Sequence, residues 1–163
     1  MKCRHLALLL VLSLLWVSCS TSNDVSKIPH ITLDAFVLNL TTLAPADSML
    51  ADTTDTCFIV FGLTDGDGDI GNDSTSQIWL KDSRYPAAGF LPTPFPAIDQ
   101  TIENPKYGLT GTCVFYPLPS PTPRTDPNHL VNGDTLTYEF YITDRANNSS
   151  NHIILHPLIV RPK

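Results

Sequence analysis

The sequence has little positive charge and almost no glutamate. It contains 10 lysine and arginine residues against 16 aspartate and glutamate residues, and only Glu103 and Glu139 are glutamates. A surface with this balance repels phosphate backbones, which argues against nucleic acid as a partner. Because aspartate favours turns and hard-cation sites over helices, the acids indicate a turn-rich protein.

No segment is apolar over the roughly 20 residues that a membrane-spanning helix needs. The apolar run at residues 6–15 follows Lys2 and Arg4 and precedes small residues, which is the layout of a secretory signal. It ends in LLWVSCS, which resembles the lipobox of bacterial lipoproteins, where a lipidated cysteine becomes the mature N-terminus. Cys19 is the matching cysteine, and nearby cleavage without lipidation is the alternative.

These signals predict three parts of the chain. They are a lipoprotein signal peptide over residues 1–18, a polar lipidated tether over residues 19–27, and one domain over residues 28–163. Acyl chains on Cys19 would hold the protein on a membrane, and we expect the outer membrane of the cell envelope, with the domain facing the periplasm or the surface. Loss of Lys2 and Arg4 with the signal leaves 8 basic against 16 acidic residues.

The chain also lacks apolar residues at helical spacing with caps, whereas β-branched and aromatic runs recur between turn residues. Seven such runs predict an all-β fold, specifically an immunoglobulin-like (fibronectin III-like) antiparallel β-sandwich, with a jelly roll or small barrel as the alternative. In this fold Tyr138 resembles the tyrosine corner, and Trp79 is expected as the buried tryptophan. The expected strands lie near residues 28–38, 56–64, 76–81, 98–103, 110–118, 135–143 and 153–160.

Proline is concentrated in two segments, FLPTPFP at residues 90–96 and PLPSPTPRTDP at residues 117–127. Because proline cannot donate a ladder hydrogen bond, we expect both to be extended, non-central connections. Aromatic residues in or near them could offer a carbohydrate platform, although burial in the core is the simpler expectation. These residues are Tyr85, Phe90, Phe95 and Tyr107.

Two cysteines remain in the domain, because Cys3 leaves with the signal peptide and Cys19 would carry the lipid. Cys57 and Cys113 fall in the second and fifth expected strands, which are neighbours in one sheet of an immunoglobulin-like fold. In an oxidising compartment an even pair of cysteines predicts a disulfide between these strands. Two buried free thiols are the alternative.

The most specific pattern is the loop TDGDGDIGND at residues 64–73, directly after an apolar strand. Crowded carboxylates repel one another unless a cation or water separates them, and calcium takes about 6 to 8 oxygen ligands. In an immunoglobulin-like sandwich the late loop TDRANNSSN, at residues 143–151, lies at the same end of the fold as this acidic loop. We therefore predict a calcium site whose carboxylates come from Asp65, Asp67, Asp69, Asp73 and Asp144.

Two alternatives account for the same loop without a metal. Arg145 could pair with the carboxylates and replace the cation. The aspartates could instead cap backbone amides in an ordinary glycine–aspartate turn.

The order of lipobox cysteine, polar tether, DGDGDIG loop, proline-rich middle and late TDRANNSSN motif resembles a family of Bacteroidetes lipoproteins. The resemblance implies a location in the envelope and an immunoglobulin-like sandwich domain. It implies no reaction.

The sequence lacks the GxSxG, HExxH and P-loop patterns of common enzymes. We therefore expect a protein that is not an enzyme, in which the sandwich has a binding or structural role toward a glycan or an envelope protein, with calcium organising one loop end. The alternative is an envelope hydrolase that acts on glycans and uses the acidic loop as its site.

Overall fold

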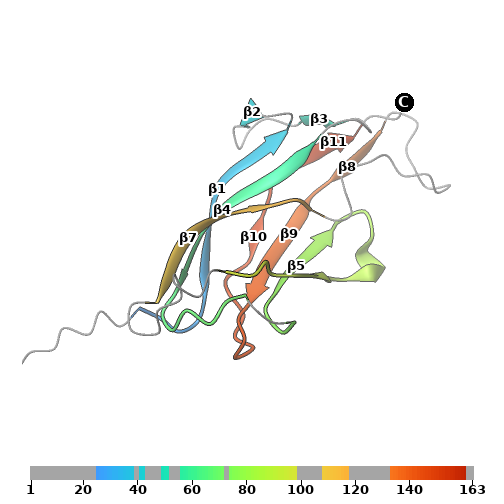
Figure 1. Cartoon of the computed structure of the whole chain (residues 1–163). Coiled ribbons are helices and arrows are strands. Elements are labelled where there is room, and N and C mark those ends of the chain that lie inside the picture. The colour runs from blue at the N-terminus through green and yellow to red at the C-terminus, as the bar shows by residue number, and fades with distance from the viewer. Residues whose placement is uncertain are drawn as a thin grey trace, which may run out of the picture.

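The computed structural model describes residues 25–38, 41–42, 49–51, 56–71, 74–98, 108–117 and 133–160. Apart from the three-residue 3-10 helix η2 (Pro86–Ala88), each regular element in these ranges is a β-strand (Figure 1). The predicted all-β class is therefore confirmed. Among the same residues, no helix has the length and apolar character to cross a bilayer.

The first sheet contains the early strands of the chain. Its strands run in the order β2-β1-β4-β7, and every neighbouring pair is antiparallel. Period-two alternation in β4 buries one face, since Cys57, Ile59, Phe61 and Leu63 are buried and the residues between them are half-buried. The bounds are β1 (His30–Leu38), β2 (Thr41–Thr42), β4 (Cys57–Asp65) and β7 (Leu109–Phe115).

The second sheet runs in the order β10-β9-β5-β6 and is also antiparallel. Its strands are β5 (Gln77–Asp82), β6 (Leu91–Pro94), β9 (Tyr138–Thr143) and β10 (Ile153–Ile154). A smaller, third sheet has the order β3-β11-β8. In it β3 is parallel to β11, and β8 is antiparallel to β11. Its strands are β3 (Met49–Ala51), β8 (Asp134–Leu136) and β11 (Leu158–Val160).

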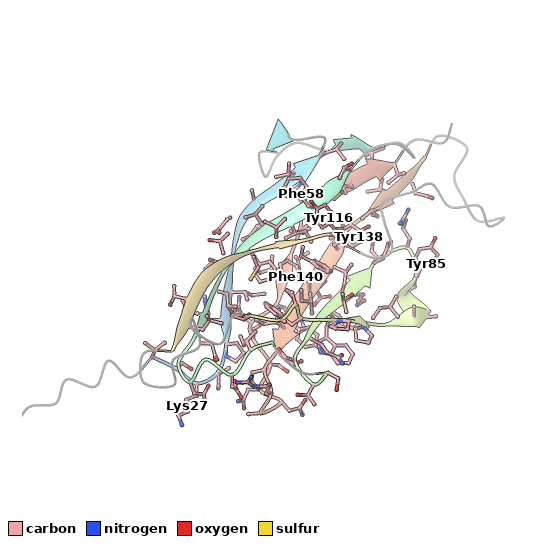
Figure 2. All side chains as sticks on the ribbon, in the orientation of Figure 1. Lys27, Phe58, Tyr85, Tyr116, Tyr138 and Phe140 are labelled. Carbon is pink, nitrogen blue, oxygen red and sulfur yellow. The ribbon has the colours of Figure 1, made fainter. Side chains whose placement is uncertain are left out.

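The core lies between the two larger sheets. Phe61 of β4 and Phe140 of β9 meet with their ring centroids 5.4 Å apart, so the sheets pack face to face. Leu136, Tyr138, Phe140 and Ile142 are at most 1% exposed, as their alternation along the strand predicts. Figure 2 shows Tyr138 and Phe140 in this interior. Burial of each such side chain stabilises the fold by about 1.5–3 kcal/mol.

Six of the seven predicted strands have counterparts whose bounds differ by a few residues. The fourth predicted strand, near residues 98–103, lies almost entirely outside the described residues. The strand near residues 135–143 is interrupted at Thr137, whose N–H donates to Ser83 Oγ and whose carbonyl accepts from Ser83 N–H. The last strand is interrupted at residues 155–157, where Pro157 cannot donate a ladder bond.

The first proline-rich segment contains β6, which pairs with β5. Pro92 and Pro94 are accommodated because β6 is at the edge of its sheet, so its outward side needs no ladder donors. The segment is extended and non-central, as predicted. Its pairing with β5 was not predicted. Most of the second proline-rich segment lies outside the described residues.

The expectation that Trp79 is a buried core tryptophan is wrong. Ile78 and Leu80 of β5 are at most 2% exposed, and strand alternation turns Trp79 to the outer face, where it is half-buried.

The predicted disulfide is also wrong, because Cys57 and Cys113 are both free. Their strands are neighbours as expected, but Cys113 lies opposite Phe61, four residues along β4 from Cys57. Four residues of strand span about 13 Å, whereas disulfide-bonded cysteines have Cα atoms about 4.4–6.8 Å apart. Burial raises the pKa of both thiols, which suits unreactive cysteines, with Cys57 buried and Cys113 half-buried.

Candidate metal centre

Four strands begin or end at one end of the sandwich. β4 ends at Asp65, β9 ends at Thr143, and β5 begins at Gln77, which pairs with Thr143. β1 begins at the same end, because His30 pairs with Thr64. In Figure 1 this is the lower end, where the turn between β9 and β10 lies below the loop that follows β4.

Carboxylates from two loops converge at this end. Asp65, Asp69 and Asp144 each offer one oxygen, and these oxygens lie within 4.8 Å of one another. Asp65 and Asp144 have no exposed surface, whereas Asp69 is half-buried. Topology thus brings Asp144 to the acidic loop across a sequence separation of 75 residues or more, as the sequence predicted.

The acidic loop folds back on itself after β4. Asp69 N–H donates to Asp65 Oδ2 at 2.9 Å, which turns the chain over the end of the strand. Gly68 and Gly71 have φ angles of 67° and 80°, a conformation that glycine adopts without steric cost. Gly71 N–H then donates to Ser76 Oγ, whose hydroxyl donates to the carbonyl of Thr143, so the loop is attached to β9.

The second loop contacts the first through its backbone. Arg145 N–H donates to the carbonyl of Asp69, and Ala146 N–H donates to Asp69 Oδ2, both at 3.0 Å. Asn148 holds both oxygens of Asp144, with its backbone N–H 2.7 Å from Oδ1 and its side-chain Nδ2 2.8 Å from Oδ2. The exposed Asn147 has a φ of 67°, which shapes this turn.

Three carboxylate oxygens of the acidic loop have no hydrogen-bond donor among the described residues. They are Oδ1 of Asp65, Oδ1 of Asp67 and Oδ1 of Asp69, and all three are buried. An unpaired buried carboxylate oxygen is costly, and native structures pair such groups with donors, water or cations. Turn chemistry accounts for the Oδ2 atoms of Asp65 and Asp69, and it leaves these Oδ1 atoms without a partner.

The electrostatics of the cluster favour a positive charge. Burial raises the pKa of Asp65 to about 6; the Asp69 N–H opposes the shift, and the neighbouring carboxylates add to it. Burial, followed by the charges of Asp144 and Asp67, raises the pKa of Asp69, while the Ala146 N–H and the Arg145 charge lower it. A carboxylate that is hard to ionise here becomes easy to ionise beside a divalent cation.

Of the other two predicted ligands, Asp67 is not part of the converging group, and Asp73 lies outside the described residues. Sequence reasoning missed the backbone donors of Arg145 and Ala146 and the role of Ser76, which links the loop to β9. No residue pattern marks a backbone N–H as a partner, although serine next to a strand start is a common local hydrogen-bonding residue.

No family model and no curated protein sequence matches this chain. Among solved structures it is similar to a Niemann-Pick type C2 protein from the Japanese carpenter ant, with a TM-score of 0.42 and 10% identity over 84% of this chain and 96% of that one. At this level the likeness supports no conclusion about the site.

The acidic loop also contacts the start of the described chain. Gly66 N–H donates to the carbonyl of Ser26 at 2.8 Å, so the predicted tether meets the domain before Ile28. The approach is close, because a Cβ on Gly66 would lie 2.2 Å from the carbonyl oxygen of Val25. Val25, Lys27 and Ile28 are exposed beside this contact.

A second candidate surface lies on the outer face of the β10-β9-β5-β6 sheet. The ring of Tyr141 is nearly parallel to those of Trp79 and His152, with centroids 6.0 and 4.5 Å away, and Phe90 packs edge-on against it at 5.1 Å. Of the aromatics proposed for a carbohydrate platform, Phe90 joins this aromatic cluster, Phe95 is 4% exposed in the core, and Tyr85 is 38% exposed at the other end. Tyr107 lies outside the described residues.

Proposed function

We propose that the protein is a cell-envelope lipoprotein whose sandwich domain has a binding or structural role, with a calcium ion organising its acidic end. The observation that carries this proposal is the buried carboxylate oxygen of Asp65, which is unpaired within the described part of the chain. Its side chain has no exposed surface, and its Oδ1 atom has no donor among the described residues. A cation held with Asp69 and Asp144 would satisfy that atom and neutralise the crowded carboxylates.

The donor set favours calcium over magnesium. The three side chains that converge each offer a carboxylate oxygen, which hard cations prefer. Magnesium requires near-ideal octahedral geometry and loses water reluctantly, whereas calcium accepts about 6 to 8 oxygens in irregular arrangements. The ligands of the proposed site are the converging Asp65, Asp69 and Asp144, with Asp67 and Asp73 as further ligands that the sequence predicts.

The strand order supports an immunoglobulin-like, fibronectin III-like sandwich. The first, second and fifth of the seven predicted strands correspond to β1, β4 and β7, which form one sheet in that order. The third, sixth and seventh correspond to β5, β9 and β10 in the other sheet. This division of strands between two Greek-key sheets is that of immunoglobulin-like domains.

The sequence around Cys19 supports an outer-membrane lipoprotein of the Bacteroidetes type. Its basic start, short apolar run and lipobox-like LLWVSCS ending fit export and lipidation. Replacement of Cys19 by alanine should move the protein from the membrane fraction to the soluble fraction. Retention of the Cys19→Ala variant in the membrane would contradict lipid anchoring at this residue.

Burial argues against the alternative of a glycan hydrolase that uses the acidic loop. Asp65 and Asp144 have no exposed surface, so only the half-buried Asp67 and Asp69 could touch a substrate. Their crowding with like charges suits a bound cation better than acid–base work, which needs two different environments. For a glycan partner, the aromatic cluster around Tyr141 is better placed, with Glu139 paired to His152 and Lys81 at its border. Aromatic rings with charged neighbours suit sugar rings and their hydroxyls.

Calorimetric titration of the mature protein with calcium tests the proposal. We expect saturable binding that magnesium does not reproduce and that Asp69→Asn abolishes, because asparagine keeps the shape and can still accept from Ala146 while losing the charge. Asp34→Asn, an exposed acidic position on β1, should bind like the native chain and serves as the matched control. Absence of binding heat, or equal binding by Asp69→Asn, would overturn the proposal.

A further inference from the structure

We propose that the acidic end of the sandwich faces the membrane, and that the bound calcium takes a phosphate oxygen of an anionic phospholipid headgroup as one of its ligands. The inference rests on the proposed function, since it needs both the lipid anchor and the calcium site. It adds a partner and an orientation to them.

The first support is the place where the tether meets the domain. The carbonyl of Ser26 accepts from Gly66 N–H, inside the acidic loop itself. From Cys19 to Val25 there are six residue steps, which reach at most about 20 Å when fully extended. The contact therefore keeps the acidic loop within about 20 Å of the acyl chains, whatever the path of the tether.

The length of the sandwich excludes the opposite orientation. β4 runs nine residues away from the acidic end, which is about 30 Å of strand. Tyr85 follows β5 at the far end, because β5 starts beside Thr143 and ends beside Tyr138. Figure 2 shows Lys27 and Tyr85 at different ends of the molecule. A tether shorter than the strand cannot bring that far end to the membrane in place of the acidic end.

The residues around the contact suit a lipid surface. Val25 and Ile28 are apolar and 46% and 55% exposed, and Lys27 between them is an exposed cation. Apolar side chains flanking a lysine fit the interface between acyl chains and phosphate groups. Elsewhere on a soluble protein two exposed aliphatic residues need no explanation, but these two adjoin the lipid-bearing segment.

Charge makes calcium necessary for this contact. The chain without its leader has 8 basic against 16 acidic residues, and the loop at this end concentrates carboxylates, so an anionic bilayer repels the metal-free domain. A calcium ion neutralises the cluster. The three converging carboxylates offer one oxygen each, which does not fill a coordination shell of about 6 to 8 oxygens, so a headgroup phosphate can occupy a further position.

The test uses the mature lipoprotein reconstituted in vesicles. Trp16 leaves with the signal, so Trp79→Phe removes the remaining tryptophan, and a single reporter can then be placed by Ile28→Trp or, as the matched control, by Tyr85→Trp. Both positions are exposed, at 55% and 38%. The vesicles contain brominated phosphatidylcholine, which quenches nearby tryptophan, with or without phosphatidylglycerol.

We expect calcium to increase quenching of the reporter at position 28 several-fold in vesicles with phosphatidylglycerol, and to leave the reporter at position 85 unchanged. Asp69→Asn should abolish the increase, and excess inorganic phosphate should reduce it by competing for the ion. An equal increase without phosphatidylglycerol would overturn the anionic headgroup as the ligand.

Calorimetry on the same reporter chains distinguishes failure of the membrane-facing orientation from failure of the calcium site. Calcium binding without any increase in quenching at position 28 would overturn the membrane-facing orientation and leave the calcium site standing. Absence of calcium binding would overturn the site and this inference together.

Discussion

Asp65 is the last residue of β4, and its fully buried carboxyl group needs either a proton or a cation. Asp69 N–H satisfies one of its oxygens, and the other faces the acidic cluster without a donor among the described residues. The sequence predicted this chemistry from the spacing of the loop aspartates. It could not predict which oxygens remain unpaired, because that depends on backbone donors from a loop 75 or more residues away.

The calcium-free protein should lose stability as the pH rises through the range in which Asp65 ionises. Its native pKa of about 6 lies above the usual 3.8, so the native state binds more protons in that window. The stabilisation is complete below about pH 4 and is lost as the pH passes about 6. Asp69, whose pKa is also raised, acts in the same direction.

Asp65→Asn removes this ionisation and isolates its effect. In chelator, thermal unfolding of the native chain and the variant should diverge between about pH 4 and pH 7, with the variant more stable at pH 7 by on the order of 1–2 kcal/mol. A constant difference in unfolding midpoint across this range would mean that Asp65 is not the group responsible.

At the scale of elements, alternation predicted the strands well but not their registers or contacts. Leu136 to Ile142 are buried at every second residue, as their pattern required. Trp79 was assigned to the wrong face because analogy with immunoglobulin domains outweighed the alternation of Ile78 and Leu80 around it. β6 was missed as a paired strand because proline normally opposes pairing, and only an edge position permits it.

Register also decides the state of the cysteines. Titration of thiols in the denatured, unreduced mature protein should find two, from Cys57 and Cys113, since Cys19 would have no free thiol if it is lipidated as proposed. The β4–β7 pairing keeps the two apart by four residues of strand. Finding no reactive thiol would contradict this register.

Gly66 of the acidic loop donates a hydrogen bond to Ser26 in the N-terminal segment. Replacement of Gly66 should disturb the packing of both segments. In Gly66→Ala the added Cβ would lie 2.2 Å from the carbonyl oxygen of Val25 and 2.6 Å from that of Ser26, both backbone atoms that cannot simply rotate away. We expect a loss of about 1–3 kcal/mol in unfolding free energy.

Gly111→Ala is the matched control for this substitution. Its added Cβ meets nothing within 4 Å, so the variant should be neutral or slightly more stable than the native chain. Equal stability of the Gly66→Ala and Gly111→Ala variants in denaturant titrations would show that the contact between the acidic loop and Ser26 is not formed.

At the scale of the whole molecule, the sequence predicted that the two polar loops share one end, and the strand order brings them there. It did not predict that the tether joins the same end, because STSNDVS is polar and carries no pattern that marks a contact. The combination places the acidic cluster, the tether and the exposed Val25 and Ile28 together. The proposed ion binding and the proposed attachment to the membrane would therefore take place at the same end of the domain.

Calcium binding at the acidic end should change the unfolding midpoint of the mature protein, measured at neutral pH in chelator and in excess calcium. Calcium at about 100 times its dissociation constant stabilises a native state by about 2.7 kcal/mol, which raises the midpoint by several degrees. We expect this rise for the native chain and for Asp34→Asn, and its loss in Asp69→Asn. An equal midpoint with and without calcium in the native chain would contradict calcium binding at the acidic end.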